Sequence, residues 1–215
     1  MPHVLQVTEI FHSIQGESSQ AGWPCVFVRL TGCNLRCVWC DTAYAFHGGR
    51  RMSVEEVLVE VEQYRCPMVE LTGGEPLLQP EAIPLMEDLL RRGYRVLLET
   101  GGSLSIEHVP RGVVRIVDVK CPGSGESDRN RWENVGILER EDELKFVVAD
   151  REDYTWASRQ VRERELARRC GVLFSPVHGR LHPGDLARWI LEDGLPVRVQ
   201  IQLHKVLWPC VERGV

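Results

Sequence analysis

The chain has 215 residues, of which 43% are hydrophobic, so it is long enough to bury a core as one domain over residues 1–215. Its net charge of −5 argues against a broad nucleic-acid-binding surface, and we expect no nucleic-acid partner. No apolar run approaches the roughly 20 residues of a membrane span, and the start of the chain lacks a signal-peptide pattern. We therefore expect a cytoplasmic protein without a membrane partner.

Apolar, β-branched runs alternate with amphipathic stretches along the chain. The runs predict buried strands at residues 25–32, 68–74, 94–100, 113–120, 143–150, 171–176 and 197–203. The amphipathic stretches predict helices at residues 53–64, 80–93, 153–171 and 182–194. Ser53, with Glu56 three residues later, predicts a capping box at the start of the first helix. This alternation predicts an α/β fold with parallel strands, either a barrel or an open wound sheet.

Glycine-rich and polar segments follow six of the predicted strands. They cover residues 33–42, 72–76, 99–102, 118–123, 175–179 and 202–205. Ligands of parallel α/β proteins bind at the carboxyl ends of the strands. We therefore expect these segments to meet at one edge of the sheet and to form a site there.

Three of the eight cysteines lie close together, as Cys33, Cys37 and Cys40. This C-x3-C-x2-C spacing cannot place all three in disulfides, and it would not place them on one helix face. A structural zinc site needs four ligands, and the nearest fourth thiol, Cys25, lies in a predicted strand. A four-iron cluster held by three thiolates leaves one iron open to an exogenous ligand, and we favour it over zinc. The other cysteines are predicted to be small buried hydrophobic residues: Cys25, Cys66, Cys121, Cys170 and Cys210.

A second motif, "LTGGEPLLQ", follows one strand–helix unit later. Gly73 and Gly74 allow the backbone to approach a ligand closely. Glu75 offers a negative charge, and Pro76 stiffens the exit toward the next helix. Thr-Gly-Gly alone is also an ordinary turn, but after a three-cysteine loop it favours a ligand site.

"CNLRCVWC" (residues 33–40) together with "TGGEP" (residues 72–76) resembles the radical S-adenosylmethionine (SAM) superfamily. The resemblance implies a partial, shortened parallel β/α barrel. It also implies that Cys33, Cys37 and Cys40 hold a [4Fe-4S] cluster whose open iron chelates the amino and carboxylate groups of SAM. Reductive cleavage of SAM would then yield a 5′-deoxyadenosyl radical.

A longer stretch, "FHSIQGESSQAGWPCVFVRLTGCNLRCVWCDT" (residues 11–42), resembles the 7-carboxy-7-deazaguanine synthase family. "DVK" and "QIQLHKVLW" match it too, so the resemblance covers nearly the whole chain. It implies a lyase of queuosine and deazapurine biosynthesis that converts 6-carboxy-5,6,7,8-tetrahydropterin to 7-carboxy-7-deazaguanine, releases ammonia and regenerates SAM. It further implies magnesium, a homodimer and a flavodoxin- or ferredoxin-like electron donor.

The same resemblance assigns binding residues, while the catalytic proton-transfer groups stay unassigned. Thr42 would reach the magnesium ion, a hard cation that prefers oxygen ligands. The residues expected around the pterin are Ile14, Gln15, Gly16, Arg29 and Thr72. Those expected around SAM are Gly74, Asp118, Val119, Lys120, Ser175, Pro176, Val177 and His178. Gln15 offers both donors and acceptors to a pterin edge, and Arg29 can bind a carboxylate bidentately or form a surface salt bridge.

Some positions depart from the family pattern or stay ambiguous. Ser18 stands where the family usually has a second glycine. Asp41 is an acceptor near the magnesium or, more simply, a turn residue. His204 faces the substrate or is a structural hydrogen-bonding residue. Residues 208–215 offer no clear match to relatives in which the terminal carboxylate contacts the substrate.

Two other functions fit parts of the sequence. An activating enzyme for a glycyl-radical partner would share the cysteine loop and "TGGEP", but it would not need Gln15 and Glu17. A non-catalytic zinc or iron–sulfur module would explain the cysteines but not the many glycine-rich segments.

Overall fold

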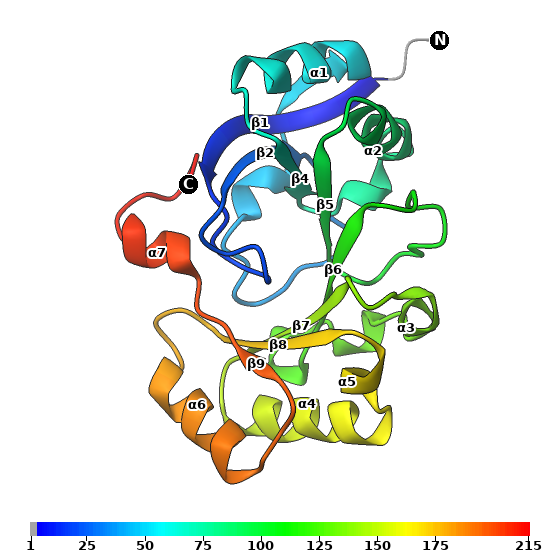
Figure 1. The fold of residues 1–215 in the computed structure, drawn as a ribbon. Coiled ribbons are helices and arrows are strands. Elements are labelled where there is room, and N and C mark those ends of the chain that lie inside the picture. The colour runs from blue at the N-terminus through cyan, green and yellow to red at the C-terminus, as the bar shows by residue number, and fades with distance from the viewer. Residues whose placement is uncertain (1–3) are drawn as a thin grey trace.

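A single curved sheet of nine strands dominates the computed structural model, which describes residues 4–215 (Figure 1). Its strand order is β3-β1-β2-β4-β5-β6-β7-β8-β9. The strands are β1 (Val4–Ile14), β2 (Pro24–Leu30), β3 (Arg50–Ser53), β4 (Met68–Gly73), β5 (Arg95–Thr100), β6 (Val114–Val119), β7 (Glu143–Val148), β8 (Gly171–Pro176) and β9 (Arg198–Val199). Every pairing from β2 to β9 is parallel. The sheet is not closed, and the prediction of a partial parallel β/α barrel is confirmed.

The sequence pattern did not predict β1, the longest strand. It runs antiparallel to both β2 and β3. Its register shifts between Val7 and Glu9, so buried and exposed residues do not alternate along the strand. Without regular alternation, the segment lacks the period of two residues from which a strand is predicted.

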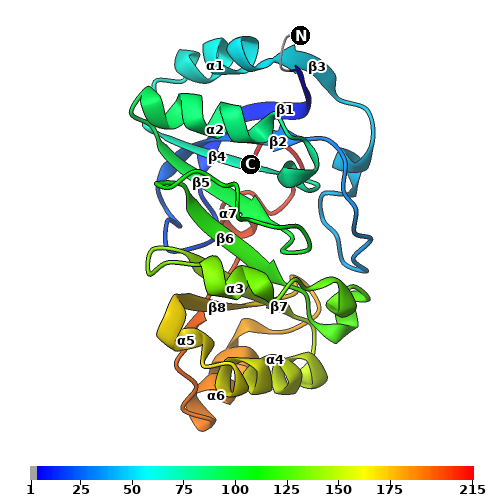
Figure 2. The same ribbon diagram turned by 90° about the vertical axis from the view of Figure 1, so that its right-hand side faces the viewer.

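Helices cover the outer side of the curved sheet (Figure 2). The longer ones are α1 (Val54–Gln63), α2 (Ala82–Arg91), α4 (Arg151–Glu163) and α6 (Pro183–Glu192). The capping box of α1 is confirmed, because Glu56 N donates to Ser53 Oγ at 3.2 Å and Ser53 N donates to Glu56 Oε2 at 2.7 Å. The predicted single helix over residues 153–171 is wrong. It breaks into α4 and α5 (Leu166–Arg169), because Glu165 adopts a left-handed backbone with φ of 50°.

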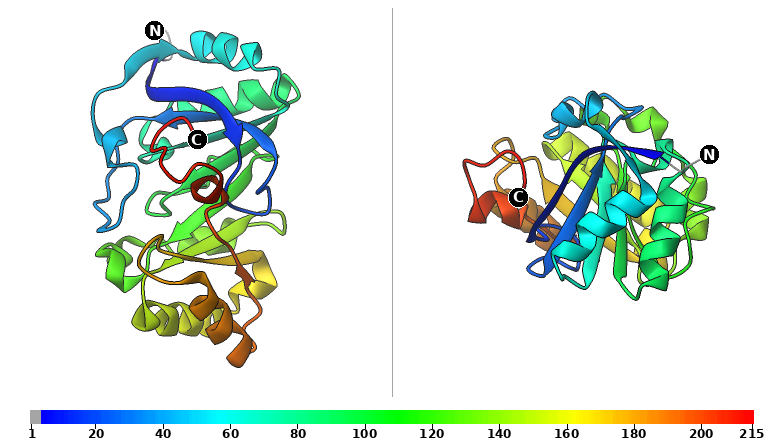
Figure 3. Two further views of the ribbon diagram at one scale, coloured as in Figure 1. Left: turned by 90° about the vertical axis from the view of Figure 1, so that its left-hand side faces the viewer. Right: turned by 90° about the horizontal axis from the view of Figure 1, so that it is seen from above.

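The chain after β8 also differs from the prediction of a strand over residues 197–203. Only Arg198 and Val199 pair with β8, and α7 (Leu203–Leu207) follows. "QLHK" therefore lies at the start of a helix and not at the end of a strand. Figure 3 shows α7 and the C-terminal segment crossing the open, concave side of the sheet. This side holds the candidate site.

Shorter helices lie in the connections between the strands. They are η1 (Ala43–Phe46), η2 (Pro76–Leu78), η3 (Pro122–Ser124), η4 (Ser127–Arg129) and α3 (Glu133–Ile137). Four of the five scattered cysteines are buried, as predicted, but Cys210 is exposed, so that prediction is wrong for Cys210. Among residues 4–215, no helix is both long enough and apolar enough to span a membrane.

Candidate active site

A cavity of about 360 Å³ opens on the concave side of the sheet. Its walls come from the carboxyl ends of the parallel strands, the cysteine loop, the β1–β2 connection and α7. Of the seventeen residues that the sequence assigned to metal, SAM or pterin, all but Pro176 line it. Segments far apart in the chain therefore meet at one site, as the position of the motifs after the strands predicted.

The cysteine loop and the Thr-Gly-Gly-Glu motif pack directly against each other. Gly32 has a φ of 97°, which favours glycine, and its carbonyl accepts a hydrogen bond from Glu75 N at 2.8 Å. A Cβ atom on Gly74 would lie 2.1 Å from that carbonyl oxygen. Gly74 must therefore be glycine for the two motifs to meet.

The three loop cysteines fit a four-iron cluster. All three line the cavity and are partly exposed to it. Burial raises the pKa of the Cys33 and Cys37 thiols, so their thiolates require a compensating positive charge such as iron. Within residues 4–215, no three His, Cys, Asp or Glu side chains converge as they would around a single metal ion. A cluster binds each thiolate through a different iron, so it accommodates cysteines that are spread around a cavity wall.

The side chain of Glu75 stabilises the Thr-Gly-Gly-Glu motif through hydrogen bonds. Its side chain is fully buried, and it accepts hydrogen bonds from Thr100 Oγ1 at 2.9 Å, Gly101 N at 2.8 Å and Leu77 N at 3.0 Å. These donors belong to the end of β5 and to η2. Glu75 thus fixes the glycine turn relative to β5, a structural role that the sequence did not indicate.

Lys145, on β7, is the centre of a buried ion-pair network. Its Nζ atom lies 2.7 Å from Glu17 Oε2 and 3.2 Å from Asp118 Oδ1, and it also contacts Glu99. Lys120 Nζ lies 2.5 Å from Asp118 Oδ2. Although burial opposes its charge, the three carboxylates hold the pKa of Lys145 well above its usual range. Four elements are therefore linked through one ammonium group.

The sequence analysis placed Glu99 in a segment of the expected site, but it missed Lys145 and Glu70 as cavity residues. Each of these two is a charged residue inside an apolar run that predicts a buried strand. A charged side chain in such a run must be paired or must face a cavity. That conflict between charge and position is the signal that would have identified them.

Arg29 lies on the cavity wall, where its side chain is largely buried and pairs with Glu9. Its Nε donates to Glu9 Oε1 at 2.8 Å, and the Tyr44 hydroxyl donates to the same oxygen at 2.8 Å. Its side chain is only 11% exposed, so the alternative of a salt bridge holds for the pairing with Glu9 but not for a position at the surface. Within residues 4–215 its two terminal nitrogens have no hydrogen-bonding partner, which leaves them available to a ligand.

The start of α7 contacts the cysteine loop at Asp41. Lys205 Nζ lies 2.9 Å from Asp41 Oδ2, and Gln202 donates to the same carboxylate at 3.3 Å. Asp41 is therefore more than a turn residue. His204 lines the cavity, and a Cβ atom on Gly16 would lie 2.1 Å from its Nδ1 atom.

Two further positions clarify the ambiguous parts of the sequence. Ser18 has a φ of 63°, a conformation in which glycine carries less strain, and its N–H donates to Gln200 Oε1 at 2.6 Å. This explains why a glycine suits the position. Val215 lines the cavity, although the sequence analysis assigned no residue of the tail to it.

Glu70, on β4, also lines the cavity and is 2% exposed. Its carboxylate accepts a hydrogen bond from Gln15 Nε2, while Gln15 Oε1 accepts one from Glu17 N at 2.7 Å. Burial, and after it the negative charge of Glu99, raises the pKa of Glu70 well above its ordinary value of 4.5.

The chain resembles several known proteins over nearly its full length. Residues 27–112 match the family model described as the radical SAM superfamily. The 7-carboxy-7-deazaguanine synthase of Koribacter versatilis is 49% identical, with 98% of this chain and all of that protein covered. The synthase of Chlorobaculum tepidum is 46% identical, with 98% and 97% covered. The crystal structure of QueE from Escherichia coli shares the fold, with a TM-score of 0.76, 21% identity, and 94% and 95% of the two chains covered.

Replacement of Glu70 by Gln should change how stability depends on pH. A carboxyl with a raised pKa in the folded protein stabilises the fold fully below its unfolded pKa, and this contribution declines as pH rises toward the folded pKa. In urea titrations at increasing pH above 4.5, the free energy of unfolding of Glu70→Gln should therefore rise relative to that of the unaltered protein. The gain should be at most about tenfold in the folding equilibrium per pH unit. A difference that does not depend on pH would show that Glu70 ionises alike in both states.

Proposed function

The chain belongs to the 7-carboxy-7-deazaguanine synthase family of radical SAM enzymes, and we propose that it converts 6-carboxy-5,6,7,8-tetrahydropterin to 7-carboxy-7-deazaguanine with release of ammonia. The observation that carries the proposal is the convergence of the three cysteines, Arg29 and Gln15 on one cavity. A pterin with a carboxylate needs a cationic group and amide donors, and this cavity offers both beside the thiols. We also propose that residues 1–215 form one domain.

Membership of the radical SAM family implies a [4Fe-4S] cluster and SAM. When bound, they supply a 5′-deoxyadenosyl radical that abstracts hydrogen. We propose Cys33, Cys37 and Cys40 as the cluster ligands. The SAM-binding residues in this proposal are Gly74, Asp118, Val119, Lys120, Ser175, Pro176, Val177 and His178. Asp118 is already held by Lys120 and Lys145, so its position is fixed before a ligand arrives.

The substrate would lie on the opposite wall. We propose Ile14, Gln15, Gly16, Arg29 and Thr72 as its binding residues. Arg29 is restrained by Glu9 through Nε alone, so its terminal nitrogens can bind the substrate carboxylate. Thr72 Oγ1 donates to Glu99 Oε2 at 3.1 Å, which orients the hydroxyl along the cavity wall.

We propose that α7 limits the access of water to the radical, because His204 and Lys205 of this helix line the cavity. Leu203 N donates to Gly16 O at 2.9 Å, and Lys205 pairs with Asp41. These two contacts attach α7 to the β1–β2 connection and to the cysteine loop. Partial exclusion of water would also strengthen the charge interactions inside the cavity.

We further propose that the enzyme uses Mg²⁺, with Thr42 as its protein ligand. The Thr42 side chain lines the cavity, 3.7 Å from Cys40 Sγ. Mg²⁺ commonly keeps several waters and takes few protein oxygens, so one hydroxyl together with the substrate carboxylate suits it.

Three properties of the enzyme in the cell complete the proposal. The electron donor would be a flavodoxin- or ferredoxin-like protein, because cluster chemistry of this kind needs one-electron reduction. A reducing, cytoplasmic setting suits eight free cysteines. A homodimer would cover exposed apolar side chains that lie close together in the chain after β8, namely Val199, Ile201, Val206, Leu207 and Val211.

The reaction itself is the first test. Anaerobically reconstituted protein with SAM, Mg²⁺, a reductant and the carboxytetrahydropterin should form the deazapurine and ammonia. Replacing Cys33, Cys37 or Cys40 by Ala should abolish both SAM cleavage and product. Cys66→Ala is the matched control, since Cys66 is buried and does not line the cavity. Cleavage of SAM at the normal rate by Cys37→Ala would refute the assignment of the cluster ligands.

Thr42→Ala tests the magnesium site. The variant should load iron normally, because Thr42 is not a thiolate, but it should need more Mg²⁺ for half-maximal rate. A magnesium titration of the rate, with iron content measured alongside, separates the two effects. If variant and unaltered protein give the same titration curve, Thr42 does not bind the ion.

Arg29→Ala tests the carboxylate contact. Loss of one partner of a buried charge pair typically costs about 2–5 kcal/mol, which is roughly thirty-fold to several-thousand-fold in substrate Kd. SAM affinity and iron content should not change. Arg29→Lys should recover only part of the loss, because an ammonium lacks the planar fork.

Glu9→Gln provides the control for the Arg29 experiment. It weakens the Glu9–Arg29 ion pair but keeps the guanidinium in the cavity. If Glu9→Gln weakened substrate binding as much as Arg29→Ala, the effect would come from the broken ion pair and not from a lost substrate contact.

A further inference from the structure

Five acidic side chains line the cavity, and four of them are paired with lysine. Glu17, Glu99 and Asp118 contact Lys145, and Asp41 contacts Lys205. Glu70 is the exception: among residues 4–215 its carboxyl group has only the Gln15 amide as a hydrogen-bonding partner. It has no cationic partner, although it is among the most deeply buried of the five.

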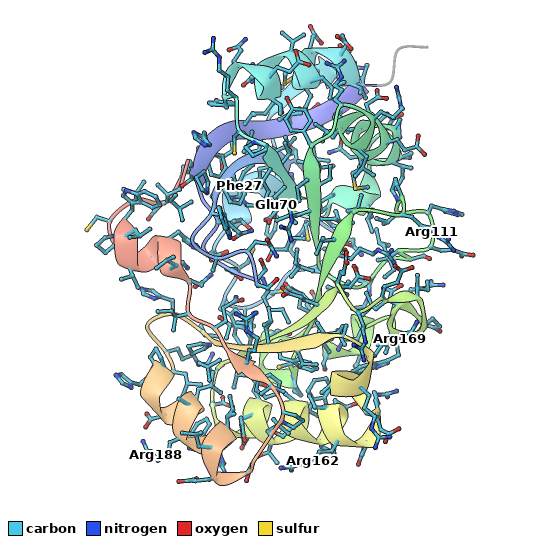
Figure 4. The ribbon with its side chains drawn as sticks, viewed as in Figure 1. Phe27, Glu70, Arg111, Arg162, Arg169 and Arg188 are labelled. Atoms are coloured by element: carbon cyan, nitrogen blue, oxygen red, sulfur yellow. The ribbon has the colours of Figure 1, made fainter. Side chains whose placement is uncertain are left out.

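Glu70 lies deeper in the cavity than Arg29. In the parallel β2–β4 pairing Glu70 is opposite Phe27, whereas Arg29 is opposite Thr72, two residues nearer the carboxyl ends of the strands. Two residues correspond to about 6.6 Å along a strand. Figure 4 shows Phe27 and Glu70 together inside the curve of the sheet. A bicyclic ring that is held at its carboxylate by Arg29 can therefore extend down to Glu70.

The charged groups around Glu70 leave its carboxyl without compensation. Glu99 from β5 and Glu17 from the β1–β2 connection add negative charge, and Lys145 and Arg29 oppose them. Burial, the negative charge of Glu99 and that of Glu17 outweigh the two cations and raise the pKa of Glu70. A ligand that presents adjacent N–H donors would supply the missing partner.

We propose that Glu70 is the specificity-determining residue that recognises the 2-amino group and the N3–H of the pterin ring. These two parallel donors match the two oxygens of a carboxylate, as a guanidinium does. The inference rests on the proposed function, because it takes the carboxytetrahydropterin as substrate. It adds the group that would distinguish a pterin from a ring with an oxygen at C2.

The experiment compares two ligands on each protein. One is 6-carboxy-5,6,7,8-tetrahydropterin, and the other is the corresponding lumazine, in which a carbonyl oxygen replaces the 2-amino group. Calorimetry with reconstituted protein, SAM and Mg²⁺, without reductant, gives both dissociation constants. The unaltered protein should prefer the pterin. In Glu70→Gln the amide presents one acceptor and one donor, which fits the lumazine, so the preference should fall by about ten- to a hundredfold.

The preference is a ratio measured on one protein sample, so a fraction of misfolded variant cancels from it. Glu99→Gln is the matched control, because Glu99 is a neighbouring cavity carboxyl that already has Lys145 as a partner. An unchanged ratio in Glu70→Gln, or an equal change in Glu99→Gln, would overturn the assignment of Glu70. If the unaltered protein neither bound nor converted the pterin, the proposed function would fail as well. The two failures are therefore distinguishable.

Discussion

The ammonium group of Lys145 is the interaction on which the rest of the site depends. It lies between carboxylates from the β1–β2 connection, β5 and β6, so four elements share one buried charge. Removing one member of such a group leaves the others buried without compensation, which costs far more than a surface ion pair contributes. The concave side of the open sheet can therefore stay polar and still hold its shape.

The open sheet places two different walls on either side of this network. The parallel strands provide the wall with Asp118, Lys120 and Gly74, while the antiparallel pair β1–β2 provides the wall with Gln15 and Arg29. A closed barrel would fill the space between them with side chains. Because this sheet stops at β3 and β9, the space is left for ligands, and α7 and the C-terminal segment cross its open side.

Patterns over short stretches of sequence predicted the features that depend on residues close together in the chain. The parallel strands, the α1 capping box and the position of the motifs after strands follow from hydrophobic period and turn chemistry, and the structure agrees. The left-handed Glu165 was missed. The register shift between Val7 and Glu9 and the helix at Leu203 were missed as well, because they depend on partners distant in the chain. The paired partners of Lys145 were missed for the same reason, since no spacing rule relates residues 17, 99, 118 and 145.

The contact between Gly16 and α7 has a consequence for how the protein matures. Gly16, two residues after β1, must lack a side chain so that His204 can pack on it, and its carbonyl accepts a hydrogen bond from Leu203 N. These partners are separated by almost the whole chain, so a ribosome has made every strand before the covering helix emerges. Until α7 docks, the cavity therefore lacks the wall that His204 and Lys205 provide.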